Sequence, residues 1–231
     1  MKKRKNAEWS DKPLEVQRLY EVFSRYQATP GQMQGCPCCV SDEDVARLFA
    51  KPLTQLTDDD LSRYSGKAIT TWGDEDEFKH FLPRLLELAL ETGEVDFIGN
   101  KFPLAGWPNW NVEEVEAISC FFHFAWKNIT IDDDWKIDDW IGALYRLNED
   151  LMPFFREWLE SPTEKSASFI TSWVISENFT SLPNDVQKIL LIDVKQRLET
   201  QYLEHPDTPD AIQLAEAVDY LHSLRGLIHE N

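Results

Sequence analysis

Three cysteines whose spacing could support metal binding or thiol chemistry lie close together at Cys36, Cys38 and Cys39, in the stretch GCPCCV. A structural zinc site needs about four thiolate or imidazole ligands around one ion. Because the side chains of adjacent cysteines diverge, Cys36 with either Cys38 or Cys39 is the easier pair. We expect His80, in the helical segments that follow, to complete a zinc site with the three cysteines.

The same cysteines allow two other interpretations. Cys36 and Cys39 have the two-residue spacing of thiol–disulfide redox motifs, and Ser41 can begin a helix just after them. The strand–helix–strand context of thioredoxin-like proteins is missing from the sequence, which weakens this reading. Cysteine also packs as a small apolar residue, and Pro37 favours a tight turn, so a purely structural role stays open.

A second unusual stretch, ITIDDDWKIDDWIGALYRL, places two tryptophans among five aspartates. Its candidate binding residues are Asp132, Asp133, Asp134, Trp135, Asp138, Asp139 and Trp140. A helix N-terminus with its tryptophans packed inward explains part of this pattern, because aspartates stabilise the positive end of a helix. The five adjacent carboxylates repel one another, which helix capping alone does not explain. We therefore also expect a docking surface for a basic protein, in which the tryptophans serve as anchors.

Other candidate sites are weaker. Asp134 and Asp138, one helical turn apart, could hold Mg²⁺ or Ca²⁺, but the glycine and final glutamate of an EF-hand loop are missing. Cys120 and His123 form a further pair within SCFFHFAW, a segment that indicates buried core. The sequence has no P-loop, no dinucleotide fingerprint, no Gly-x-Ser-x-Gly and no His-Glu-x-x-His.

The charge of the chain restricts its partners. Its 41 acidic and 23 basic residues give a formal net charge of −18, which would repel nucleic-acid phosphates and anionic membranes and attract a basic partner. No apolar run is long enough to cross a membrane, and the MKKRK start lacks the apolar segment of a secretory signal. We therefore expect a cytoplasmic protein with reduced cysteines.

Helical periodicity dominates the chain and predicts an all-α fold. We expect about ten helices stacked as antiparallel hairpins, either α-solenoid-like or as an irregular helical bundle. Residues 1–231 form a single helical domain in this interpretation, with a candidate sub-boundary in the irregular stretch 93–110.

Helix boundaries can be predicted at several residues. We expect N-caps at Ser41, Thr57 and Asp74, each followed by acidic residues, and a capping box that starts at Asn111. Pro83 interrupts an apolar stripe, so we expect a kink or a new helix there.

The stretch GCPCCVSDEDVARLFAKPLTQLTDDDLSRY, followed by FKHFLPRLLELA, resembles a group of bacterial proteins that share a cysteine-rich turn, a KPL step and an FLPR segment. The resemblance covers residues 35–90, about a quarter of the chain. No activity is established for that group, so the resemblance implies a bacterial, intracellular origin and transfers no catalytic residue.

The sequence supports three functions. The favoured one is a non-enzymatic, acidic helical protein that binds a basic protein partner, as an immunity or adaptor protein does, because opposite charges speed encounter. The first alternative is a zinc-binding or thiol-based enzyme centred on the cysteine cluster. The second is a helical scaffold that binds a peptide in a concave groove. No residue is assigned a catalytic role.

Overall fold

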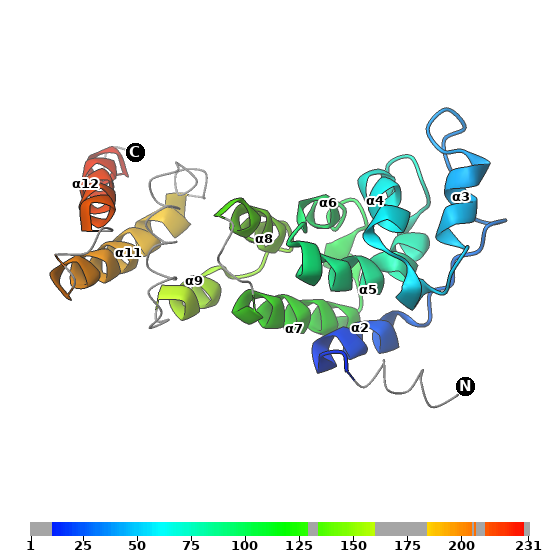
Figure 1. Ribbon diagram of the computed structural model, residues 1–231, viewed down its shortest axis with the longest axis horizontal. Helices are drawn as coiled ribbons and strands as arrows, with labels where there is room; N and C mark the ends of the chain where they lie inside the picture. The colour runs from blue at the N-terminus through cyan, green and yellow to red at the C-terminus, as the bar shows by residue number, and fades with distance from the viewer. Residues whose placement is uncertain (1–10, 129–133, 160–183, 205, 207–210, 229–231) are drawn as a thin grey trace. The chain divides into compact units, whose positions relative to one another are not determined.

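The structure is a computed structural model that describes residues 11–128, 134–159, 184–204, 206 and 211–228. These residues form ten α-helices and two short 3₁₀ helices, and they contain no β-strand (Figure 1). The predicted all-α fold with about ten helices is confirmed. None of the helices in these ranges combines the length and the apolar character that crossing a bilayer requires.

The chain divides into two compact units. The first comprises Met1–Ile129 and Asp139–Glu149, and the second comprises Thr130–Asp138 and Asp150–Asn231. Residues 93–110, the candidate sub-boundary, lie wholly inside the first unit.

The helices of the first unit are α2 (Leu14–Phe23), α3 (Asp42–Leu48), η1 (Leu53–Gln55), α4 (Asp58–Lys67), α5 (Glu75–Thr92), α6 (Asp96–Gly99), η2 (Trp107–Asn109) and α7 (Val112–Asn128). Helix α8 (Asp134–Arg146) lies mostly in the same unit. Helix α2 packs against both α5 and α7, although α7 follows it far along the chain.

The predicted N-caps are confirmed at the starts of α3, α4 and α5. Ser41, Thr57 and Asp74 each accept a hydrogen bond from a backbone N–H in the first helical turn, and each forms a complete capping box. At α4, Lys51 and the Thr57 backbone N–H donate to the Asp60 carboxylate, which lowers the pKa of Asp60 to about 2. These caps fix where the helices around the cysteines begin.

Helix α5 continues through Pro83, so the expectation of a new helix there is wrong. A proline inside a helix removes one backbone hydrogen bond. The turns on both sides of Pro83 nevertheless bury Leu82, Leu85 and Leu86 completely or nearly so. This apolar burial outweighs the lost hydrogen bond and keeps the helix continuous.

Residues 93–110 contribute aromatic side chains to the core of the first unit. Phe102 is fully buried, and its ring lies 5.3 Å from that of Trp107, 5.7 Å from that of Trp110 and 6.1 Å from that of Phe78. The stretch is irregular but packed around Phe102, Trp107 and Trp110, which face the core, whereas Phe97 and Leu104 are exposed.

The close approach of α6 and α8 requires a glycine. A Cβ atom at Gly99 would stand 2.8 Å from the Cβ and 3.0 Å from the Cα of Ala143. Further along the chain, Trp107 Nε1 donates to the carbonyl oxygen of Leu147 at 2.9 Å. These contacts hold the second half of α8 against the first unit.

A buried ion pair links three segments of the first unit. Lys79 Nζ lies 3.1 Å from Glu114 Oε2 and 2.8 Å from Glu75 Oε1. Glu114 is fully buried and also accepts a 2.5 Å hydrogen bond from Tyr26. The Lys79 ammonium stands 4.3 Å above the ring centre of Trp110. Through Lys79, Glu114 and Tyr26, these contacts connect α5 to α7 and to the segment that follows α2.

The capping box predicted at Asn111 is half correct. Asn111 Oδ1 accepts a hydrogen bond from the Glu114 backbone N–H at 3.1 Å, as an N-cap does. The Glu114 carboxylate, however, bonds to Tyr26 and Lys79 instead of the Asn111 backbone. The buried ammonium is the stronger attraction for a carboxylate that is removed from water.

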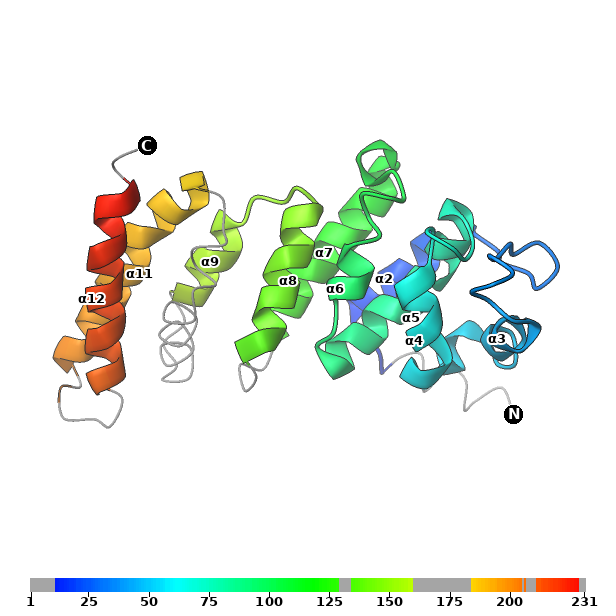
Figure 2. The same cartoon turned by 90° about the horizontal axis from the view of Figure 1, so that it is seen from above.

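The second unit contains α9 (Met152–Leu159), α11 (Asn184–Glu204) and α12 (Ala211–Ile228). Helices α11 and α12 run in opposite directions and pack side by side (Figure 2). Their contact buries Leu198 of α11 together with Leu214 and Leu221 of α12. The pair is a helical hairpin of the kind that the sequence predicts.

Candidate metal centre

The cysteine loop between α2 and α3 is fixed by the segment that follows α4. Gly35 and Trp72 form an isolated antiparallel bridge. The Cys36 backbone N–H donates to the Thr71 carbonyl oxygen at 2.8 Å. The loop is therefore held in place on one side by backbone hydrogen bonds, as the edge of a small sheet would be.

The cysteines themselves lie on a tight turn. The Cys36 carbonyl oxygen accepts hydrogen bonds from the N–H groups of Cys39 at 2.8 Å and Val40 at 2.9 Å. Pro37 stands at the second position of the turn, where its fixed φ is favourable. A Cβ at Gly35 would lie 2.9 Å from the Cβ of Val40, so glycine is required for the chain to close on itself.

Two basic side chains of α4 hold the end of this turn. Arg63 Nη2 and Lys67 Nζ donate to the Cys39 carbonyl oxygen at 3.0 and 3.1 Å. Arg63 Nε also lies 3.1 Å from Asp44 Oδ1, which joins the turn to the first turn of α3. The backbone of the turn is thus held by α4, through two basic side chains on the Cys39 carbonyl oxygen.

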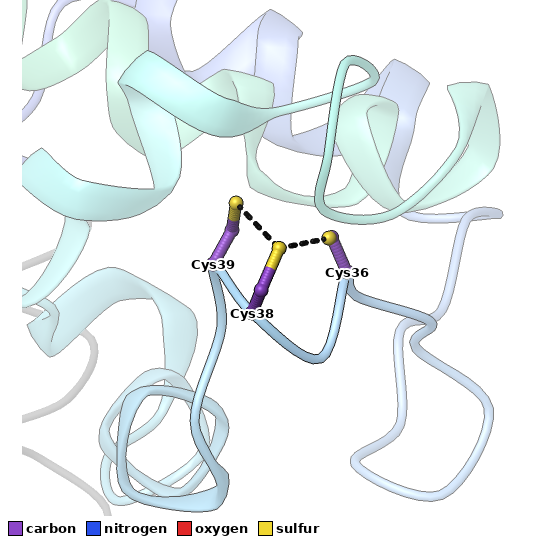
Figure 3. A group of neighbouring side chains, drawn as sticks. All are labelled: Cys36, Cys38 and Cys39. Atoms are coloured by element: carbon purple, nitrogen blue, oxygen red, sulfur yellow. Dashed lines mark hydrogen bonds between the residues drawn. The ribbon is translucent and has the colours of Figure 1, made fainter.

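The three sulfur atoms point to the same side of the turn (Figure 3). Cys38 Sγ lies 2.9 Å from Cys36 Sγ and 3.5 Å from Cys39 Sγ. Hydrogen bonding with Cys38 lowers the pKa of Cys36, whereas hydrogen bonding with Cys36 and Cys39 raises the pKa of Cys38 to about 11. Cys38 is exposed and the other two are half-buried, so ions in solution can reach the sulfurs.

The cluster has the dimensions of a metal site. All three sulfurs lie within 4.8 Å of one another. With Zn–S bonds of about 2.3 Å, two thiolates on one tetrahedral zinc ion are about 3.8 Å apart. Small rotations of the side chains would reach that spacing. The sulfur atoms of the adjacent residues Cys38 and Cys39 lie close together, although we expected adjacent side chains to diverge.

His80 belongs to a different environment. Its Nδ1 lies 3.0 Å from the Tyr26 carbonyl oxygen, and its ring packs edge-on against Phe81. Burial lowers the pKa of His80. In the described part of the chain, the cluster of possible ligands contains the three cysteines and not His80.

The exposure of Cys120 and His123 corrects the interpretation of their segment as buried core. Both side chains are exposed on α7, whereas the aromatic segment that contains them suggested buried core. The core side of this helix is formed by Ala117, Ile118, Phe121, Phe122 and Ala125. Cys120 and His123 fall between these positions on the helix and so face outward.

The acidic tryptophan stretch is only partly described. Asp132 and Asp133 lie outside the described residues, and the backbone of Asp134 and Trp135 begins α8. In the same helix, Asp138 and Asp139 are half-buried, and both take part in interactions.

Trp140 is a core residue. Its side chain is 1% exposed, its Nε1 donates to the Gly93 carbonyl oxygen at 3.1 Å, and its ring lies 5.5 Å from that of Phe122. The Trp140 side chain is therefore not part of the exposed surface, and its assignment to a docking surface stays a prediction. The inward packing that the sequence offered as the alternative holds for Trp140.

Sequence reasoning missed the residues that position the cysteine turn. Arg63 and Lys67 are 24 and 28 residues from the Cys39 carbonyl that they hold. No local pattern indicates such contacts, because they depend on how α4 packs beside the loop. Comparison with protein-family models, with curated proteins and with solved structures yields no match for this chain.

Proposed function

We propose that this protein binds a thiophilic metal ion, with zinc as the first candidate, through Cys36, Cys38 and Cys39. The observation that carries the proposal is the convergence of three accessible sulfurs within 4.8 Å. Thiolates are the ligands that zinc and other soft ions prefer. The hydrogen bonds of the turn with Thr71, Arg63 and Lys67 support the proposal, because a turn that is already fixed loses little conformational freedom on binding.

The first prediction concerns metal content. Protein purified under reducing conditions and loaded with Zn²⁺ is expected to retain about one zinc ion per chain after dialysis, and Cys36→Ser is expected to lose it. Each thiolate supplies one of few bonds to the ion, so removing one should weaken binding by about 10-fold to 100-fold or more. Metal analysis and competition with a chromophoric chelator measure both quantities.

The matched control is Cys120→Ser, which alters an exposed cysteine on α7 that lies outside the cluster. It should bind zinc as the unaltered protein does. Zinc retention that does not depend on Cys36, or no retention at all, would overturn the proposal. Circular dichroism of each variant shows whether the fold is preserved.

We also propose a second function, the binding of a basic protein partner, which the net charge of −18 supports. The first turns of three neighbouring helices carry exposed carboxylates, namely Asp42, Glu43, Asp58, Asp59, Glu75 and Asp76. Their charge raises the local concentration of cationic proteins and speeds encounter at low salt. Asp138 and Asp139 remain the candidate contact residues in the described part of α8.

The second prediction tests where such a partner binds. A basic protein of the source cell should bind at low salt, and its association rate should fall about tenfold or more as ionic strength rises to physiological values. Asp138→Asn with Asp139→Asn should weaken the complex. The control, Glu216→Gln with Asp219→Asn on α12, removes the same charge from two exposed positions elsewhere. Equal weakening by both pairs would show a general charge effect and contradict the assigned surface.

A further inference from the structure

The three-thiol turn has no fourth sulfur ligand. All four cysteines of the chain lie in the described residues, and Cys120 is not part of the cluster. Among the histidines in those residues, none joins the group either. Closed zinc sites take four protein ligands, so the three thiols, as the ligand group that the described residues form, leave such a site one ligand short. An ion that is complete with three sulfur bonds fits this turn better.

Trivalent arsenic and antimony have that property, because each forms three bonds and keeps a lone pair in the fourth direction. We infer that Cys36, Cys38 and Cys39 bind a trivalent metalloid hydroxide, for which arsenous acid, As(OH)₃, is the probe. The inference rests on the proposed function in one respect, the convergence of three thiols on a single ion. The inference differs from the proposed function in the bound species, which is a trivalent metalloid instead of a divalent metal ion.

The binding reaction balances without an oxidant or reductant. Each thiol transfers its proton to one hydroxyl group of As(OH)₃, water leaves, and an As–S bond forms. Three such exchanges release three molecules of water and give a neutral trithiolate. Arsenic remains trivalent and the sulfurs are not oxidised, so three reduced thiols are all that the protein must supply.

The geometry of the turn suits this product. The sulfurs share one side of the turn, and Cys38 Sγ lies 2.9 Å from Cys36 Sγ and 3.5 Å from Cys39 Sγ (Figure 3). Cys38 is exposed, so the lone pair of the bound atom can face water. The incoming acid is uncharged at neutral pH, so the net charge of −18 does not repel it.

The test uses the full chain, reduced with a phosphine because dithiols would compete for arsenic. Mass spectrometry under native conditions is expected to show one arsenic atom bound with the loss of three protons. Each of Cys36→Ser, Cys38→Ser and Cys39→Ser should weaken retention by about 100-fold or more, since the third thiol acts at a high effective concentration. Cys120→Ser should bind as the unaltered protein does.

Parallel loading with Zn²⁺ separates this inference from the proposed function. Zinc retained without arsenic would overturn the inference alone. Arsenic retained without zinc would overturn the zinc proposal and support three-thiol coordination. Equal arsenic binding by Cys38→Ser and the unaltered protein would show that two thiols suffice and would also overturn the inference. Circular dichroism again confirms that the variants compared are folded.

Discussion

Glu114→Ala is expected to lower the free energy of unfolding by about 3 kcal/mol, the lower end of the range for removing one partner of a buried ion pair. The Glu114 carboxylate is fully buried and holds both Lys79 and the Tyr26 hydroxyl. Removing this carboxylate leaves the buried Lys79 ammonium with one negatively charged partner fewer. The loss stays near the lower end because Glu75 still lies 2.8 Å from Lys79 Nζ. Urea unfolding followed by tryptophan fluorescence measures the change.

The neighbouring residue provides the control. Glu113 pairs with Arg18 and Arg25, but all three side chains are about half exposed. Exposed pairs contribute about 0.2–1 kcal/mol each, so Glu113→Ala should have a much smaller effect. Similar losses from both substitutions would contradict the assignment of Glu114 as the carboxylate that stabilises the contact between α5 and α7.

The same ion pair predicts how stability depends on pH. Burial alone would raise the pKa of Glu114, but hydrogen bonds from Tyr26 and Lys79 lower it below its ordinary value. A lowered pKa in the folded state contributes stability that is complete above the unfolded value, about 4.3, and is lost as the pH falls through the folded value. The pKa of Lys79 is raised in spite of its burial, by Glu75 and Glu114, so its contribution is lost only at alkaline pH.

We therefore expect the stability difference between the unaltered protein and Glu114→Gln to shrink as the pH falls below about 4. Unfolding free energies at several pH values measure this difference. The pH-dependent contributions of other carboxylates, such as Asp60, cancel because both proteins contain them. A difference that stays constant down to acid denaturation would show that the charge of Glu114 contributes nothing.

Trp140→Ala is the second substitution with a large expected effect, a loss of about 3–5 kcal/mol. The indole is 1% exposed and packs on Phe121 and Phe122, so alanine leaves a cavity, and the Gly93 carbonyl loses its donor. Tyr145→Ala on the same helix is the control, because Tyr145 is 58% exposed. It should change stability by less than about 0.5 kcal/mol. A stable Trp140→Ala protein with weakened partner binding would restore the tryptophan to the docking surface.

Local signals in the sequence predict much of this fold. Ser41, Thr57 and Asp74 can be recognised as caps because donor and acceptor lie within one helical turn of each other. The apolar residues Val16, Leu19, Tyr20 and Phe23 of α2 recur with the helical period and are buried. The cysteine cluster is equally local, since its three members lie on one turn.

The rest depends on contacts between residues that are distant in the chain. The Glu114 side chain bonds to Tyr26, 88 residues away, instead of completing its capping box. Cys120 lies among aromatic residues in the sequence, yet it faces solvent, because packing against α2 decides which side of α7 is buried. Sequence periodicity indicates that a helix has a buried side, but neighbouring helices determine where that side lies.

The packing of α2 on α7 also has a consequence for biosynthesis. Translation proceeds at about 5–20 residues per second, so α2 leaves the ribosome several seconds before α7 has been made. During that interval Val16, Leu19 and Phe23, all buried in the finished fold, face water in the nascent chain. Chaperones that bind exposed apolar segments would have an early target here, and translation stopped before residue 112 would yield a chain in which α5 can pack on α2 but α7 is missing.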